Sequence, residues 1–347
     1  MRFLHFFIYF LGCFGIIATA LPFIKIDFWL IRIFSFPRVQ IAVLCLLAIV
    51  LFLIFLKLKK IFNMVLLSLL GAAFIYQVVL VVPYTPFYRL QALPAKPTVD
   101  KNNFSIMEAN ILMSNKKVEA FIDNVEQHNP DLLLLLEPNS WWALRLRELD
   151  KEYPYSIKYP LENTYGMMLF SKFPLKEAEI NFIVEEDIPS FYARVVLPSG
   201  EKFDLYCIHP KPPTASTSKY PMDTELMRIG KMVKKRGRPA IVMGDFNDVS
   251  WSFTVGLFQE YTNLLDPRQG RGLYNTFDAH VPLWRYPLDH FFYSKQFGLL
   301  EFERLGNTGS DHFALYIKLH FDPKMDYSNS EWDLDDRVEN EVEEVLD

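Results

Sequence analysis

Three long apolar stretches at the N-terminal end of the chain constrain its fold more than any other feature of the sequence. Phe3 to Ile24 is almost wholly apolar, Ile41 to Leu56 is uninterrupted, and Ile61 to Val82 has three polar interruptions. A helix crosses the hydrocarbon core of a bilayer, about 30 Å thick, with about 20 apolar residues. Each stretch therefore predicts a transmembrane helix, and Lys57 and Lys59 can extend the short middle one by snorkelling.

The first stretch has a second interpretation. Ala18, Thr19 and Ala20 are the small residues that a signal-peptide cleavage site requires. Two further apolar stretches follow, however, and Arg2 is the only charge before the first one. These two observations favour three uncleaved spans, and hence a multi-pass protein of the cell membrane.

Basic residues on the two connecting loops give opposing indications of orientation. The tight turn 57–60 holds three lysines and belongs in the cytoplasm under the positive-inside rule, which places everything after Pro83 outside the cytoplasm. The first loop opposes this with Lys25, Arg32 and Arg38. The predicted location of the downstream domain is extracytoplasmic by a narrow margin.

Composition divides the rest of the chain into three parts. Residues 84–103 are rich in proline, which excludes a helix or a central strand and predicts a linker. Residues 104–321 alternate between strand-like and helix-like patterns and predict a folded domain after the membrane domain of residues 1–83. Residues 322–347 carry a net charge of −9 and few large apolar side chains, which predicts a disordered or weakly helical acidic tail.

Strand patterns outnumber helix patterns in residues 104–321, and some neighbours could pair as hairpins, as around 198–200. This favours a mixed α/β sandwich over a purely parallel sheet. The predicted strands are 104–109, 132–136, 166–170, 191–197, 203–208, 240–243, 290–293 and 313–319, and the predicted helices are 115–129 and a stretch that includes Leu226, Ile229 and Val233. Cys207 is the one cysteine of the domain and is interpreted as a packing residue.

Polar residues that suit phosphoester hydrolysis follow several of these apolar runs. This reaction needs charge stabilisation on the phosphoryl oxygens, an oriented water and help for the leaving oxygen. Carboxylates such as Glu137 suit Mg²⁺, and Asp245 and Asn247, two apart on an extended stretch, face the same way. One of them could take a proton from water while the other holds a phosphate oxygen or the metal. The candidates are Asn110, Glu137, His209, Asp245, Asn247, Asp289, Asp311 and His312.

Most of these residues also have a structural explanation. Asn110 could cap a turn, Glu137 could be a solvated strand end, and His209 could be a loop residue before a proline-rich exit. His290 is interpreted as structural. The segment Asp245-Phe246-Asn247 is the hardest to explain without an active-site loop, because two polar residues follow a buried run through one glycine.

Taken in order, these motifs resemble the endonuclease/exonuclease/phosphatase superfamily, the DNase I-like group. The resemblance spans roughly residues 104–320, and the N-terminal spans resemble a bacterial membrane-anchored branch. The motifs that carry it are Asn110, Glu137, Tyr165-Gly166 with Ser171-Lys172, His209, Gly244-Asp245-Phe246-Asn247, Leu288-Asp289-His290 and Gly309-Ser310-Asp311-His312. Ala314 stands where many relatives have proline, which concerns the start of a strand rather than the chemistry.

The resemblance implies a fold of two mixed sheets flanked by helices, a four-layer sandwich, and a role for each residue. Glu137 and Asp311 would serve the metal, with Asn110 on the metal or phosphate side. Asp245 would orient or deprotonate the attacking water, and Asn247 would hold the water or the phosphate. The histidines His209 and His312 would contact the scissile phosphate, with Asp289 paired to His312.

Together these features predict a membrane-anchored phosphoesterase that uses Mg²⁺, with Mn²⁺ as a substitute. The tether favours a lipid-linked or headgroup phosphate at the bilayer as the substrate, and no protein partner is implied. Two alternatives stay open. One is a nuclease outside the membrane, which the net charge of −3 over residues 101–321 does not favour. The other is a catalytically inactive binding module.

Overall fold

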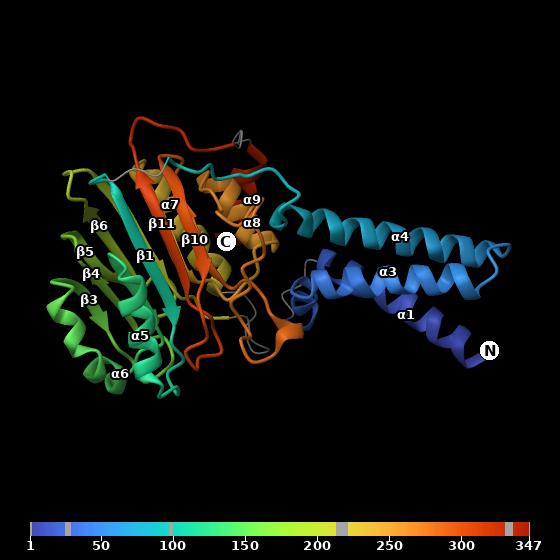
Figure 1. Ribbon diagram of the computed structural model, residues 1–347. Coiled ribbons are helices and arrows are strands. Elements are labelled where there is room, and N and C mark those ends of the chain that lie inside the picture. The colour runs from blue at the N-terminus through green and yellow to red at the C-terminus, as the bar shows by residue number, and fades with distance from the viewer. Residues whose placement is uncertain (1, 25–28, 97–99, 213–220, 330–335, 347) are drawn as a thin grey trace. The chain divides into compact units, whose positions relative to one another are not determined.

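The computed structural model of the protein describes residues 2–24, 29–96, 100–212, 221–329 and 336–346. These residues form two compact units, and the chain passes from one to the other at Tyr88 and Arg89 (Figure 1). Residues 213–220, the larger part of the loop 211–223 that is rich in proline, serine and threonine, lie outside the described residues.

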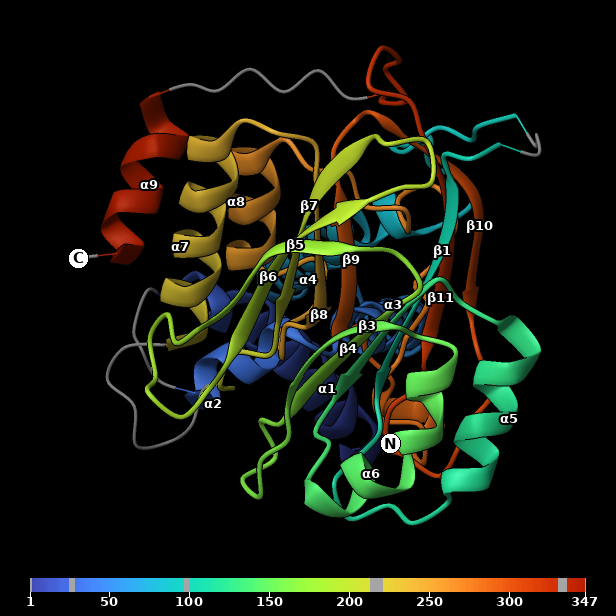
Figure 2. The same ribbon diagram turned by 90° about the vertical axis from the view of Figure 1, so that its left-hand side faces the viewer.

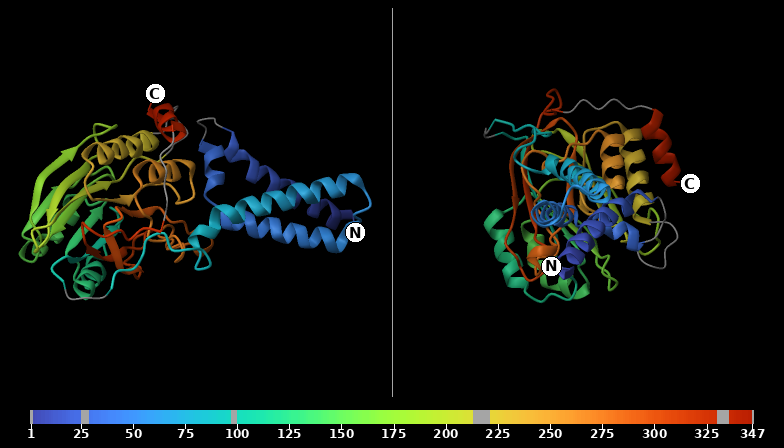
Figure 3. Two further views of the ribbon diagram at one scale, coloured as in Figure 1. Left: turned by 90° about the horizontal axis from the view of Figure 1, so that it is seen from above. Right: turned by 90° about the vertical axis from the view of Figure 1, so that its right-hand side faces the viewer.

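The first unit is built on three long apolar helices that pack side by side (Figure 3). Arg2–Phe23, Arg38–Phe55 and Ile61–Tyr84 are long and apolar enough to cross a membrane, with mean hydropathies of 2.0, 2.7 and 2.5. Their outward-facing side chains are apolar, as a lipid-facing surface requires. The elements are α1 (Arg2–Ala20), η1 (Leu21–Phe23), α2 (Trp29–Arg32), η2 (Ile33–Ser35), α3 (Arg38–Phe55), α4 (Ile61–Val81) and η3 (Val82–Tyr84).

The second unit contains two mixed β-sheets that pack face to face (Figure 2). The six-stranded sheet has the order β10-β11-β1-β2-β4-β3, and the five-stranded sheet has the order β5-β6-β7-β8-β9. Only the pairs β1–β2 and β7–β8 are parallel. The strands are β1 (Asn103–Asn110), β2 (Leu132–Leu136), β3 (Tyr155–Tyr159), β4 (Met167–Ser171), β5 (Leu175–Asn181), β6 (Ser190–Val196), β7 (Lys202–Ile208), β8 (Ala240–Asp245), β9 (Asp289–Tyr293), β10 (Phe297–Arg304) and β11 (Leu315–Phe321).

Helices cover the outer face of each sheet and complete four layers. Side chains that alternate along each strand pack inward between the sheets or outward against helices, such as Ile106 inward and Met107 outward. Helices α5 and α6 cover the six-stranded sheet, α7 and α8 cover the five-stranded one, and α9 packs against α7 and α8 (Figure 2). The helices are α5 (Val118–His128), α6 (Ser140–Arg145), η4 (Arg147–Lys151), α7 (Pro221–Arg236), α8 (Phe253–Thr262), η5 (Pro282–Trp284) and α9 (Asp336–Leu346). The predicted sandwich is confirmed.

Of the two interpretations of the acidic tail, disorder is wrong for residues 336–346, which form the helix α9. Val338 and Val342 lie four residues apart on one face of this helix, and both are buried against the core beneath α7 and α8. Salt bridges support the contact, with Lys231 to Glu343 at 2.7 Å and Arg337 to Glu260. The high net charge of the tail did not indicate the narrow apolar stripe on α9, which is sufficient to dock this helix on the domain.

The proline-rich segment forms neither a helix nor a central strand, as predicted, yet part of it is not a free linker. The amide of Leu93 donates to the Tyr327 carbonyl at 2.7 Å, and that of Ala95 donates to the Leu299 carbonyl at 2.9 Å. Residues 92–95 thus lie along β10 and belong to the second unit.

Candidate active site

The strand order brings the predicted polar residues to one edge of the sandwich. Asn110 ends β1 and Glu137 follows β2, while His209 follows β7 and Asp245 ends β8. Because β1–β2 and β7–β8 are parallel pairs, the carboxyl ends of each pair meet at the same edge of their sheet. The antiparallel strand β9 begins at that edge, where Asp289 lies opposite Asp245.

The backbone is strained where these side chains leave the strands. Glu137 and Asn247 have positive φ angles of 65° and 53°, which non-glycine residues seldom adopt. Gly244, at φ 135°, lies so close to β7 that a Cβ would stand 2.0 Å from the Ile208 carbonyl oxygen. A cluster of such conformations is typical of a functional site.

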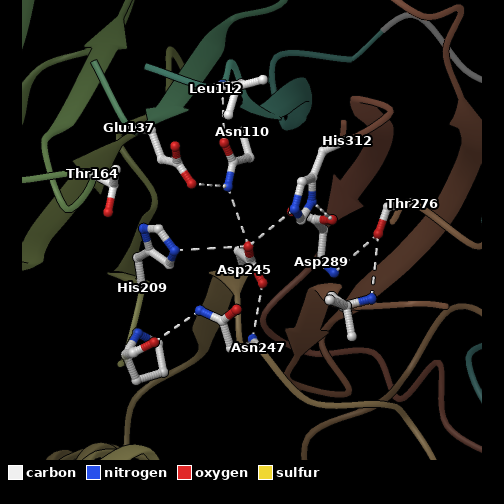
Figure 4. A network of polar contacts seen from close by, with 12 residues as sticks. Asn110, Leu112, Glu137, Thr164, His209, Asp245, Asn247, Thr276, Asp289 and His312 are labelled. Carbon is white, nitrogen blue, oxygen red and sulfur yellow. Dashed lines mark hydrogen bonds and ion pairs between the residues drawn. The ribbon is translucent and has the colours of Figure 1, made fainter. Parts of the chain in front are cut away.

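Asn110 connects the two sheets through its side-chain amide. Its Nδ2 donates to Glu137 Oε1 at 3.0 Å and to Asp245 Oδ2 at 3.2 Å, as Figure 4 shows. The Met113 amide donates to the other oxygen of Glu137 at 3.3 Å. Burial raises the pKa of Glu137 above its usual value, although these hydrogen bonds oppose the shift. Two carboxylates, one from each sheet, therefore converge on the amide nitrogen of Asn110, while its side-chain oxygen accepts from the Leu112 amide at 3.1 Å.

Asp289 and His312 form a buried dyad. His312 Nδ1 lies 2.8 Å from Asp289 Oδ2, and its Nε2 lies 3.6 Å from Asp245 Oδ2 (Figure 4). Burial disfavours the imidazolium, but the negative charges of Asp289 and then Asp245 outweigh it and raise the pKa of His312 to about 10. His312 is therefore a cation at neutral pH. Thr276 fixes the start of β9, because its hydroxyl accepts from the Asp289 amide at 3.3 Å.

His209 lies on the other side of Asp245 and differs from His312 in charge. Its Nε2 is 3.7 Å from Asp245 Oδ2. Burial lowers the pKa of His209, and the charge of Asp245 only partly opposes this. His209 is therefore neutral at pH 7, in contrast to His312. Tyr165 packs its ring 5.3 Å from this imidazole.

Asp245 lies at the centre of the site and is 1% exposed. Burial and then the charge of Asp289 raise its pKa to about 6. The Asn247 amide donates to Asp245 Oδ1 at 2.8 Å, and the Asn247 side chain donates to the Pro210 carbonyl at 2.9 Å. One hydrogen of the Asn247 side-chain amide is therefore bonded to the loop that follows His209.

Asp311 lies beside His312 and is half-buried. Ser310 donates its hydroxyl to Asp311 Oδ1 at 3.3 Å, and the charge of Asp311 acts on both Glu137 and His312. All eight candidates therefore lie at this edge of the sandwich.

Two buried residues that were not predicted from the sequence, Glu108 and Arg268, contact Asp289. Glu108 is fully buried two residues before Asn110 and lies beside Asp289. Arg268 is 1% exposed, forms a salt bridge with Asp266 at 2.9 Å and contacts the His290 ring. His290 also contacts the Asp248 carbonyl, in keeping with a structural role. Glu108 could have been recognised from the sequence, because it is an acidic residue inside an apolar strand and lies on the same face of that strand as Asn110.

A sequence profile decides which family this site belongs to. The profile of the Endonuclease/Exonuclease/phosphatase family matches residues 107–312, more than half of the chain. The chain belongs to this family. Its members are metal-dependent phosphoesterases and nucleases, so the predicted enzyme class, a metal-dependent phosphoric ester hydrolase, is confirmed.

Comparison with solved structures gives the same fold. The catalytic domain of human Nocturnin superimposes with a TM-score of 0.52 at 19% identity, covering 65% of this chain and 96% of its own. TDP2 from D. rerio, complexed with a single-strand DNA product, gives 0.51 at 16% identity, covering 63% and 99%. An endonuclease/exonuclease/phosphatase from Bacteroides vulgatus gives 0.52 at 16% identity, with the same coverage. No match is found among curated proteins.

Family membership implies a divalent metal, and two groups of side chains could hold one. Asp245, Asp289 and His312 have ligand atoms within 4.8 Å of one another. In this group, however, His312 Nδ1 and Asp289 Oδ2 are already paired with each other at 2.8 Å. Glu137 and Asp311 supply the hard carboxylate oxygens that Mg²⁺ prefers, and the Asn110 amide positions Glu137, so the residues present fit the ion.

Proposed function

We propose that this protein is a membrane-anchored phosphoesterase that hydrolyses a phosphate ester or diester at a bilayer surface with the help of Mg²⁺. The observation that carries the proposal is the convergence of Asp245, His312 and Glu137 at one edge of the sandwich, in a chain with three helices able to cross a membrane. Mn²⁺ is the expected substitute metal. The proposed substrate is a lipid-linked or headgroup phosphate.

The side chains suggest a division of labour in an in-line attack by water. Asp245, whose pKa is raised to about 6, would orient the water and accept its proton. The imidazolium of His312, held by Asp289, would donate to a phosphoryl oxygen as negative charge develops there. His209 and Asn247, on the opposite side of Asp245, would position the phosphate.

Glu137 and Asp311 would hold the metal with Asn110. The bound ion would neutralise charge on the phosphoryl oxygens. Removal of Mg²⁺ with EDTA should therefore abolish turnover, and Mg²⁺ or Mn²⁺ should restore it.

A nuclease is the second candidate, because TDP2, one of the structures that share this fold, was solved with a single-strand DNA product. The net charge of −3 over residues 101–321 favours a lipid phosphate over nucleic acid. An inactive binding module is the third, and retention of all eight polar residues argues against it.

The deciding experiment uses the full chain in lipid nanodiscs. Release of phosphate or headgroup is measured on bis-p-nitrophenyl phosphate, single-stranded DNA and a lipid pyrophosphate in the bilayer, with Asp245→Asn as the matched control. Metal-dependent hydrolysis of the lipid, lost in the variant and absent on DNA, is expected. Preferential cleavage of DNA would identify a nuclease instead, and Mg²⁺ binding without any hydrolysis would contradict both enzymes.

A further inference from the structure

The loop between α8 and β9 ends in a tip that exposes three large apolar side chains. Val281, Leu283 and Trp284 are 41%, 77% and 53% exposed. The short helix η5 (Pro282–Trp284) brings them together at the tip. These three side chains do not belong to a buried core of the domain, so packing does not explain why they are apolar. Clustered exposed apolar residues mark an interaction surface.

The base of this loop is attached directly to the candidate active site. The amide of Ala279 donates to the Asp311 carbonyl at 2.7 Å, and Phe277 forms a bridge with His312. The rings of Phe277 and His312 lie 5.0 Å apart. An apolar contact at the tip would therefore fix the orientation of the segment that carries Asp311 and His312.

Two arginines stack on the residue that follows His312, and one of them directly follows the tip in sequence. Arg285 and Arg304 both stack on the ring of Phe313, at 4.9 Å and 4.3 Å from its centroid. Each contacts backbone carbonyls, Arg285 that of Ala279 at 2.9 Å and Arg304 that of Asn275 at 2.8 Å. Within the described ranges neither forms a salt bridge, and each affects the other as a like charge. Such a pair of cations is complementary to an anion.

We propose that residues 281–284, together with Arg285 and Arg304, contact the surface of an anionic phospholipid bilayer. Tryptophan favours the membrane–water interface, and arginine binds lipid phosphates. A bilayer is favoured over a protein partner because the same chain carries three helices able to span one. Residues 85–88 alone separate η3 from the second unit, a tether of at most about 3.6 Å per residue.

The membrane contact would serve the proposed hydrolysis of a bilayer phosphate, so its role rests on the proposed function. Insertion of the tip would present the edge of the sandwich to phosphates in the headgroup layer. The contact with lipid is nevertheless a separate property, which can be measured without any turnover.

The direct test is the depth of a fluorophore at the tip. Leu283→Cys is labelled with an environment-sensitive dye in the full-length Cys13→Ala chain, because Cys45 and Cys207 are buried and unreactive. Ser199→Cys, on an exposed turn of the same unit, is the matched control. In nanodiscs with brominated anionic lipids, the label at 283 should be quenched and the label at 199 should not. Equal quenching at the two positions would overturn the proposal and leave the tip as a surface for a protein partner.

A functional split provides the second test. Replacement of Val281, Leu283 and Trp284 together by serine should lower kcat/KM on a bilayer phosphate by about tenfold or more, because each apolar side chain contributes to lipid binding. The same variant should leave kcat/KM on bis-p-nitrophenyl phosphate unchanged. Equal losses on both substrates would indicate a distorted site and contradict the proposal. If wild type hydrolyses neither substrate, the proposed function fails while the quenching result still decides the membrane contact.

Discussion

The least expected residue of the site is Glu108, a buried carboxyl group in the interior of a strand. Burial, followed by the charges of Asp289 and Asp245, raises its pKa well above the usual range and so favours the protonated, neutral form. Within the described part of the chain, no residue other than Asp289 is in reach of its carboxyl oxygens. A neutral acid can donate a hydrogen bond to Asp289, which in turn holds His312.

A neutral amide should therefore replace Glu108 well. We expect Glu108→Gln to keep the thermal midpoint and the kcat of wild type, because the amide also donates to Asp289. Glu108→Ala should lower the free energy of unfolding by about 2–3 kcal/mol, since it leaves a cavity and an unpaired buried oxygen. Unfolding is measured in detergent by near-UV circular dichroism. A glutamine variant less stable than the alanine variant would show that Glu108 is ionised.

At the scale of elements, the contact of α7 with β6 contains a second buried acid. Glu225 on α7 accepts a hydrogen bond from the Ser190 hydroxyl at 2.5 Å, and burial raises the pKa of Glu225 to about 7. The folded-state pKa lies above the unfolded value of about 4.3, so the folded state holds the proton more tightly. The stability associated with this group is fully present below pH 4, falls as pH rises, and is lost above pH 7.

Glu225→Gln should remove this pH dependence. Between pH 5 and pH 8, the free energy of unfolding of the wild type should fall by up to about 3 kcal/mol relative to that of the variant. The reason is that the pKa of Glu225 is about 7 in the folded state and about 4.3 in the unfolded state. Thermal unfolding of both proteins across this range provides the measurement. Parallel curves would mean that Glu225 titrates normally in the folded protein.

Helix α9 offers a test of packing between elements. Val338 and Val342 are both fully buried, so replacing both with aspartate should detach the helix and lower the thermal midpoint by several degrees, a loss of a few kcal/mol. Glu344→Gln, at an exposed position on the opposite face of the helix, is the control. Unchanged stability in the double variant would show that α9 does not contribute to the fold.

The same elements show which parts of the fold the sequence can predict. Strands with a continuous apolar pattern, such as β2 and β8, were predicted to within two residues because both faces are buried. The edge strand β5 was missed because its residues are largely exposed, so no alternation distinguishes it from a loop. The docking of α9 on the domain was not predicted, because net charge was given more weight than the spacing of its valines.

At the scale of the molecule, the order of motifs predicted which residues converge but not how they pair. The convergence of all eight candidates at one edge could be predicted, because each of them follows a strand-like run and the order of the motifs resembles that of the family. The difference in charge between His209 and His312 could not be predicted, because it depends on three-dimensional proximity to Asp289. Burial of Glu108 beneath the site likewise depends on the packing of one sheet against the other.

Membrane topology is the remaining property of the whole chain. The turn between α3 and α4 holds Lys57, Lys59 and Lys60, and the positive-inside rule places it in the cytoplasm, with the enzyme unit outside. We expect an impermeant maleimide applied to intact cells to label Ser199→Cys and not a cysteine introduced at Leu58, each in the Cys13→Ala background. The opposite pattern would place the active site inside the cell, where the charges of Lys25, Arg32 and Arg38 would then have set the orientation. Substitution of those three residues by glutamine should in that case invert the chain, whereas it should strengthen the expected topology if the lysine turn dominates.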